Sequence, residues 1–299
     1  MKTKNKLSSS SGVYFALGAY LWWGFVTPIY FKFLDNVDSL ELLAWRSLSG
    51  LPILIFWLYR KDSLKTFFLV FKDLKAIRVL LATSFLIGLN WFTFIFATVE
   101  NRLSEASLGY YICPLVSVFL GYFFLRESIT KFQKIGIFLA IVGVSIPIFQ
   151  LNNFPWITVV LAFSFSLYGL LRKQLYVDSA TGLTFEMLFL FPFMFVLDLY
   201  IHSQGQASFL TNYLTSFMIL IGGFVTLVPL VLFTAAAHRL RLITVGIMQY
   251  ISPTGQFLVT LFIFNEVIST SEWISFCFVW LAVFLYALDM LCYNYKNTK

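Results

Sequence analysis

The chain has 299 residues, of which 60% are hydrophobic and only 12% are charged. Soluble domains carry roughly 25% charged residues, so this composition excludes an ordinary soluble protein and indicates a polytopic membrane protein. In a membrane protein, a net charge of +7 is expected to reflect which loops face the cytoplasm. We therefore do not expect nucleic acid as a partner.

Ten apolar runs of roughly 20 residues follow one another, each long enough to cross a bilayer as a helix. We predict an all-α membrane protein with transmembrane helices at residues 13–33, 39–59, 76–98, 104–125, 132–150, 154–172, 183–201, 216–237, 243–264 and 272–292. Residues 1–11 read as a polar tail without regular structure, and residues 296–299 as a short second tail.

Lysine and arginine are distributed unevenly between the connections. If the first residues are cytoplasmic, 18 of the 21 basic residues fall in cytoplasmic segments, Lys32 and Arg102 lie outside, and Arg46 lies within a span. This is the positive-inside pattern. It predicts a multi-pass protein of the bacterial cytoplasmic (inner) membrane with both termini in the cytoplasm and with basic loops against anionic lipid.

A spaced pattern occurs twice, with every member displaced by 139 positions. The first copy is Arg102, Leu103, Tyr111, Ile112, Pro114 and Glu127, and the second is Arg241, Leu242, Tyr250, Ile251, Pro253 and Glu266. Duplicated membrane helices are typical of transporters built from two related halves.

The two halves are expected to have opposite orientations, because each would contain five spans and five is odd. The predicted repeats are residues 12–150 and 151–295. A second correspondence, displaced by 145 positions, supports the division: Trp23, Gly24 and Glu41 match Tyr168, Gly169 and Glu186.

Arg46 is the leading candidate for substrate binding. It lies about 10 Å along the second predicted span at 1.5 Å per residue. A charge in hydrocarbon costs about 2.5–3.5 kcal/mol on insertion scales, so Arg46 should face the interior or a water-filled cavity. It could bind an anionic group there. The alternatives are an ion pair with Glu41 or Glu186, or a side chain that reaches the membrane interface.

Glu41 and Glu186 lie near the starts of the second and seventh spans. A desolvated carboxylate can exchange protons near neutral pH, so both are candidates for coupling transport to protons. The alternative is a helix-end charge at the headgroups.

Pro114 and Pro253 recur at matching positions, each with a tyrosine three residues earlier, Tyr111 and Tyr250. A proline frees the carbonyl four residues before it and bends a membrane helix. We predict hinges that expose polar backbone to a cavity, with a simple packing kink as the alternative.

Other polar or aromatic side chains inside spans are candidates to line the pathway. They are Trp23, Asn90, Trp91, Tyr111, Tyr168, Gln249 and Tyr250. The alternatives are hydrogen bonds between helices, worth about 0.6 kcal/mol each, and aromatic side chains that face lipid. Neither a cofactor nor a metal site is expected, because the two histidines have no ligand neighbours at a suitable spacing.

The chain resembles a RarD-type member of the EamA branch of the drug/metabolite transporter superfamily over nearly its whole length. The matching stretches are Gly18 to Gly24, Glu41 with Arg46, Asn90 with Trp91, Glu105 to Val116, Phe163 to Gly169 with Arg172 and Lys173, Gly182 with Glu186, Phe233 to Leu242, and Gln249 to Thr254. The resemblance implies ten helices in two inverted repeats, alternating access, and export or exchange of a small organic metabolite or drug.

The leading hypothesis is thus a secondary transporter and not an enzyme. No nucleotide-binding motif such as G-x-x-x-x-G-K-[ST] is present in the sequence, so a gradient or the substrate itself would supply the energy. The rivals are a channel-like facilitator and a membrane-embedded enzyme, and the sequence does not indicate the oligomeric state.

Overall fold

The apolar runs form helices in the computed structural model, which describes residues 2–150, 154–265 and 267–296. Within these residues, nine helices are long and apolar enough to cross a membrane. The ninth predicted span is also helical but is broken into two pieces, Leu242–Met248 and Ile251–Phe262. The predicted all-α membrane fold is confirmed in the described chain, where the second predicted span is also interrupted, at Ser49 between Ser39–Leu48 and Gly50–Arg60.

The helices follow the predicted order closely. They are α1 (Lys2–Leu21), η1 (Trp22–Val26), α2 (Thr27–Lys32), α3 (Ser39–Leu48), α4 (Gly50–Arg60), α5 (Leu64–Val70), α6 (Leu74–Val99), α7 (Leu103–Phe123), α8 (Lys131–Ile148), α9 (Trp156–Gln174), α10 (Ser179–Ser203), α11 (Tyr213–Arg239), α12 (Leu242–Met248), α13 (Ile251–Phe262) and α14 (Thr270–Lys296).

The expectation of an unstructured tail at residues 1–11 is wrong, because α1 already begins at Lys2. Its polar first residues continue the helical hydrogen bonding of the apolar run that follows. In the second predicted tail, Lys296 is the last residue of α14, and residues 297–299 lie outside the described residues. Glu266 of the duplicated pattern also lies outside them.

Three aspartates begin long helices in the same way. The side chains of Asp38, Asp73 and Asp178 each accept hydrogen bonds from two backbone amides in the first turn of α3, α6 and α10. These amides have no partner within their own helix, and capping satisfies them.

The matched prolines act differently in the two halves. Pro114 lies inside α7, which continues past it, whereas Pro253 follows the break between α12 and α13 at Gln249 and Tyr250. The first span has its own irregularity, a π-helical turn at Trp22–Val26. The segments expected to bend are therefore broken in the second half and continuous in the first.

Helix packing follows a reciprocal pattern between the halves. In three cases a span packs on the corresponding span of the other half: α8 on α14, α7 on α12, and α3 with α4 on α10. Contacts between spans of the two halves that do not correspond have a counterpart with the halves interchanged. The sixth span packs on the fourth (α9 on α7) as the first packs on the ninth (η1 on α13). It also packs on the third (α9 on α6) as the first packs on the eighth (α1 on α11). This is the pattern that a two-fold relation between the halves would produce.

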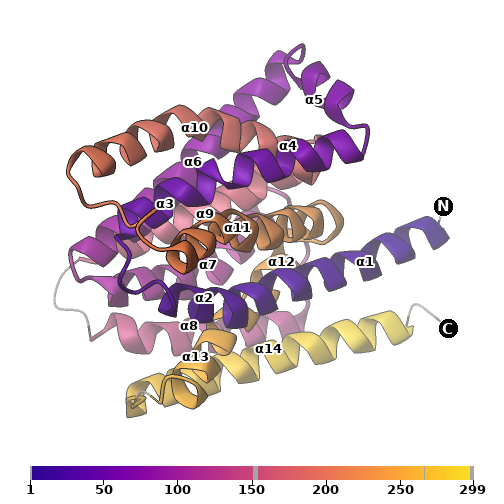
Figure 1. Ribbon diagram of the computed structural model, residues 1–299. Coiled ribbons are helices and arrows are strands. Elements are labelled where there is room, and N and C mark those ends of the chain that lie inside the picture. Colours follow the sequence, from indigo (N-terminus) through magenta and orange to yellow (C-terminus); the bar gives the residue numbers. More distant parts are fainter. Residues whose placement is uncertain (1, 151–153, 266, 297–299) are drawn as a thin grey trace.

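Figure 1 shows the helices crossing the molecule side by side, with the start of α1, the last turns of α14 and the α5 corner at one end of the bundle. The connection from α10 to α11 lies at the opposite end. One exchanged contact is especially close. A Cβ added to Gly24 of η1 would lie 3.1 Å from Cα of Gly255 in α13, so glycine on both sides permits the approach.

Candidate functional site

Arg46 contacts three other helices through its side chain. It projects from α3 and is half-buried. Its Nε donates to Oγ1 of Thr226 in α11 at 2.9 Å. Its guanidinium carbon lies 4.9 Å from the ring centroid of Trp91 in α6 and 5.5 Å from that of Phe31 in α2. Such cation–π contacts contribute about 0.5–2 kcal/mol each, depending on how far they are desolvated.

The positive charge of Arg46 has no carboxylate partner in the described part of the chain, where every ion pair involves other residues. Its Nε is fixed by Thr226, but neither Nη1 nor Nη2 has a hydrogen-bond partner among those residues. The terminal nitrogens are therefore left for an acceptor that this chain does not provide.

Neither of the two predicted ion-pair partners binds Arg46. The carboxylate of Glu41 accepts from the backbone amides of Ser208 and Phe209, at distances of 2.8 to 3.0 Å. Glu186 lies in a separate cluster with another arginine, described below. The alternative of a structural pair with Glu41 or Glu186 is wrong because both carboxylates are satisfied elsewhere.

Asn90, next to Trp91 in α6, links its helix to α9 and α7 by hydrogen bonds. Its Nδ2 donates to the carbonyl of Leu161 at 3.1 Å and to Oγ of Ser164 at 3.0 Å, both in α9. Its Oδ1 accepts from the hydroxyl of Tyr110 at 3.0 Å. Tyr110 was not among the candidates, and the only signal for it was its position beside Tyr111 in the duplicated pattern.

A cluster of aromatic side chains lies in the core. The ring of Trp23 lies 5.7 Å from Phe165 and 5.9 Å from Phe233, and Phe233 lies 6.3 Å from Tyr168. Trp91, Trp23 and Tyr110 all pack in the same contiguous core. Trp23, Trp91 and Tyr168 thus pack in one core cluster, which Arg46 contacts through Trp91 and Asn90 contacts through Tyr110.

Comparison with known proteins assigns the family. The EamA-like transporter family model matches residues 10–149. The protein named RarD in Escherichia coli (strain K12) is 35% identical over 296 residues, which are 96% of this chain and 97% of that protein. An uncharacterized transporter of Vibrio cholerae is 35% identical over 97% of this chain and 96% of its own length. The chain belongs to the RarD-type branch of the EamA-like transporter family.

The fold agrees with this assignment. A solved structure, titled only as the crystal structure of a protein, has a TM-score of 0.70 to this chain at 15% identity and covers 93% of this chain and 97% of its own. A further relative, the uncharacterized transporter YojE of Bacillus subtilis, is 35% identical over 95% of both chains. This RarD-type protein is therefore a membrane transporter within the drug/metabolite transporter superfamily, and a small molecule is its substrate.

Tyr111 and Tyr250 lie in a different part of this transporter from Arg46. They pack in a second core cluster with residues of α7, α8, α12 and α14. The Tyr111 hydroxyl accepts from Oγ of Ser275 at 3.1 Å, whereas the Tyr250 hydroxyl has no hydrogen-bond partner among the described residues. Gln249 is also buried at the break between α12 and α13. Gln249 and Tyr250 thus form the break between α12 and α13, and Tyr111 packs against Tyr250 there, away from Arg46.

Glu186 is completely buried together with Arg172. Its carboxylate accepts from Oγ1 of Thr83 at 2.6 Å and from the hydroxyl of Tyr168 at 3.0 Å, and it lies 3.7 Å from Nη1 of Arg172. The arginine passes over Gly182, where a Cβ would lie 1.7 Å from Nη1. Sequence reasoning counted Arg172 among the cytoplasmic loop charges and missed this pair.

Proposed function

We propose that this RarD-type protein is a secondary transporter that moves a small organic molecule bearing an anionic group across the cytoplasmic membrane by alternating access. One observation carries the proposal: Arg46 lies among aromatic side chains within a span, and no carboxylate of the described residues neutralises it. A cation in that place is expensive unless it has a function or a water-filled surrounding. An anionic substrate would supply the missing partner.

The chemistry of Arg46 suits carboxylate recognition. Thr226 holds Nε, so the two terminal nitrogens remain available to a pair of oxygens. A planar guanidinium binds such a pair bidentately. The rings of Trp91 and Phe31 would exclude water from the guanidinium and orient it. Asn90 with Tyr110 would offer polar contacts to the rest of the substrate.

Alternating access would come from two inverted five-helix halves, residues 12–150 and 151–295. The reciprocal packing of the spans supports this division. So does the match of the family model to residues 10–149. The segments around Pro114 and Pro253 would serve as hinges, because each proline removes a backbone N–H from its helix and the second segment is already broken at Gln249 and Tyr250. Both termini would be cytoplasmic, and net movement would be export or exchange.

Coupling to protons is assigned to Glu186. Its carboxylate connects α6, α9 and α10 through Thr83, Tyr168 and Arg172. Tyr168 also belongs to the aromatic cluster, where its ring centroid lies 6.3 Å from that of Phe233, so this cluster would be the route by which a change at the substrate site reaches Glu186. Glu41 is the second coupling candidate, but proton binding there would have to release two backbone amides.

The test begins with an untargeted metabolite comparison between deletion and overexpression cells, followed by reconstitution of the protein with the compounds that change. We expect saturable uptake into proteoliposomes and counterflow, in which unlabelled substrate inside accelerates entry of label. Flux without saturation or counterflow would instead favour the channel-like facilitator. Chemical conversion of the compound would favour the membrane-embedded enzyme.

Direction and coupling need a second measurement. An imposed pH gradient should drive accumulation by the wild type. Glu186→Gln should retain counterflow but lose the gradient-driven part, because the amide keeps the size of the side chain and cannot bind or release the proton. Equal response of the two proteins to the gradient would remove Glu186 from the coupling mechanism.

A further inference from the structure

The corner between α4 and α6 carries a concentrated positive charge. Six exposed basic side chains lie within 19 residues there, against two aspartates. They are Arg60, Lys61, Lys65, Lys72, Lys75 and Arg78. One of the aspartates, Asp73, caps α6 and also accepts from the hydroxyl of Tyr176, so it does not pair with these cations. Figure 1 shows this corner, marked α5, beside the ends of α4 and α6.

The short helix α5 has the character of a membrane-surface element. Phe67 and Val70 pack inward against the core, whereas Phe68 and Leu69 are 64% and 57% exposed. Exposed apolar side chains beside lysines match the boundary between acyl chains and headgroups, where the apolar groups enter lipid and the charges remain with the phosphates. The corner therefore lies at the depth of the lipid headgroups.

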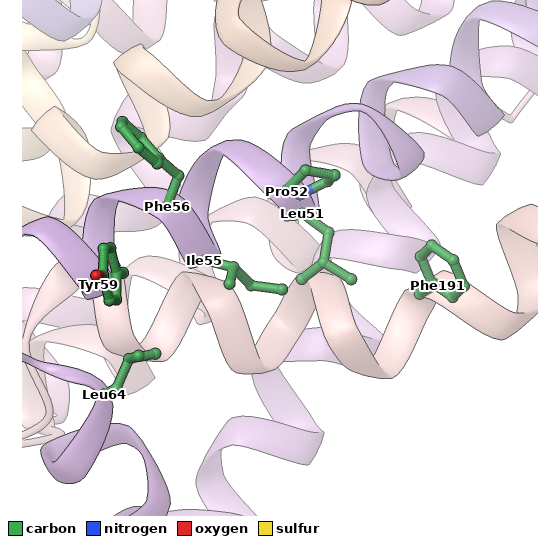
Figure 2. Close-up of a pocket in the computed structure, with 7 residues that line it drawn as sticks. All are labelled: Leu51, Pro52, Ile55, Phe56, Tyr59, Leu64 and Phe191. Carbon is green, nitrogen blue, oxygen red and sulfur yellow. The ribbon is translucent and has the colours of Figure 1, made fainter.

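A groove of about 500 Å³ begins at this corner. Its floor follows one face of α4 through Leu51, Ile55 and Tyr59, four residues apart and thus about 12 Å long at 1.5 Å per residue. Leu64 of α5 lies with Tyr59 at one end, and Phe191 of α10 lies at the other (Figure 2). Every side chain that lines it is apolar or aromatic.

The two ends of the groove differ in depth. The Tyr59 end adjoins Arg60 and Lys61, and Lys61 is placed by its contact with Trp57, whose ring centroid lies 5.5 Å from Nζ. The other end reaches Phe191, near the middle of α10. The groove therefore runs from the basic headgroup level toward the centre of the bilayer, as one acyl chain of a phospholipid does.

We propose that this groove binds one acyl chain of an anionic phospholipid whose headgroup is held by Arg60, Lys61 and Lys65. Apolar walls alone would accept any lipid. The adjoining cations make the site selective for a negatively charged headgroup, since each basic side chain near the surface contributes about fivefold to binding of anionic lipid. The proposal concerns a lipid site on the outside of the bundle and does not depend on the proposed substrate.

Native mass spectrometry of the full chain, exchanged into equal amounts of phosphatidylglycerol and phosphatidylcholine, tests the proposal. We expect the wild type to retain phosphatidylglycerol preferentially. Lys61→Gln with Lys65→Gln should reduce that preference by about 25-fold, from about fivefold for each charge. Ile55→Trp, which fills the groove while leaving every charge, should reduce retention of both lipids.

The matched control is Lys131→Gln with Lys134→Gln. It removes the same charge from exposed positions at the start of α8, on the same predicted side of the membrane but away from the groove. This control should keep the wild-type preference. Equal loss in both double variants would mean that only overall charge matters and would overturn the site. Retention of phosphatidylglycerol by Ile55→Trp, or a dimer mass in place of bound lipid, would overturn it as well.

Discussion

Tyr111 and Tyr250 meet edge to face, with ring centroids 5.8 Å apart and ring planes at 83°. They occupy the same place in the two copies of the duplicated pattern, 139 positions apart. A residue can contact its own counterpart only close to the axis that relates two copies. The contact therefore indicates a pseudo-two-fold axis between α7 and α12, and it supports an inverted-repeat architecture independently of the helix pairing.

The same substitution should have different effects at these two tyrosines. Tyr111→Phe removes the hydrogen bond between its hydroxyl and Oγ of Ser275 and should cost about 0.5–1.5 kcal/mol of unfolding free energy. Tyr250→Phe should be neutral or slightly stabilising, because its buried hydroxyl has no partner among the described residues. Thermal unfolding in detergent would compare them. A larger loss for Tyr250→Phe would contradict this assignment.

Arg46→Ala should weaken substrate binding by about 10- to 100-fold, since a charge-assisted hydrogen bond contributes about 1.5–3 kcal/mol. Arg46→Lys should also bind substrate more weakly. A lysine ammonium cannot donate to Thr226 and at the same time offer two parallel N–H donors to a carboxylate. The readout is the concentration dependence of counterflow. Arg102→Gln is the control, because Arg102 pairs with Glu105 outside the site. Unchanged affinity in Arg46→Ala would exclude a role in recognition.

Gly182→Ala should destabilise the fold strongly, because the added Cβ would lie 1.7 Å from Nη1 of Arg172 and displace the guanidinium from Glu186. Breaking a buried ion pair costs about 3–5 kcal/mol. Gly88→Ala is the matched control, since its Cβ would meet only the end of the Leu190 side chain. Folded yield and melting temperature would be compared. Equal yields and melting temperatures for the two variants would show that Arg172 relaxes at little cost.

Glu127→Ala should loosen the start of α12. The Glu127 carboxylate accepts from the backbone amides of Leu242 and Ile243 at 2.7 and 2.9 Å and so caps that helix from the connection between α7 and α8. Loss of a helix cap costs about 0.5–2 kcal/mol. Hydrogen exchange should accelerate at residues 242–246, whereas Glu100→Ala, at an exposed position, should leave it unchanged. Protection that survives in Glu127→Ala would argue against the cap.

The membrane orientation is tested with single cysteines on a background without cysteine. Ser203→Cys, at the end of α10, should react with an impermeant maleimide added outside intact cells. Ser63→Cys, in the basic corner before α5, should react only after the membrane is opened. This follows from the asymmetry of lysine and arginine. The reverse labelling would invert the topology.

Hydropathy along the chain was sufficient to predict the fold class and the order of the spans. Hydrocarbon thickness sets helix length and apolar runs reflect it directly, so the predicted limits agree with the observed helices to within a few residues, except at the start of α1. The cost of a charge in lipid also predicted that Arg46 would face inward, and its contacts with Trp91 and Thr226 agree with that expectation. The 139-residue displacement marked the fourth and ninth spans as counterparts, and α7 and α12 of these spans pack on each other.

The contacts between side chains of distant spans could not be predicted in this way and became visible in the packed helices. Arg172 read as a loop charge at the end of a span, yet the bare backbone of Gly182 lets its guanidinium lie buried beside Glu186. The proline pattern did not reveal that the helix breaks before Pro253 and continues through Pro114. Such features depend on how each helix is rotated about its own axis and on which neighbour it packs against. Close packing of side chains from distant spans fixes that rotation, and hydropathy along one span does not contain it.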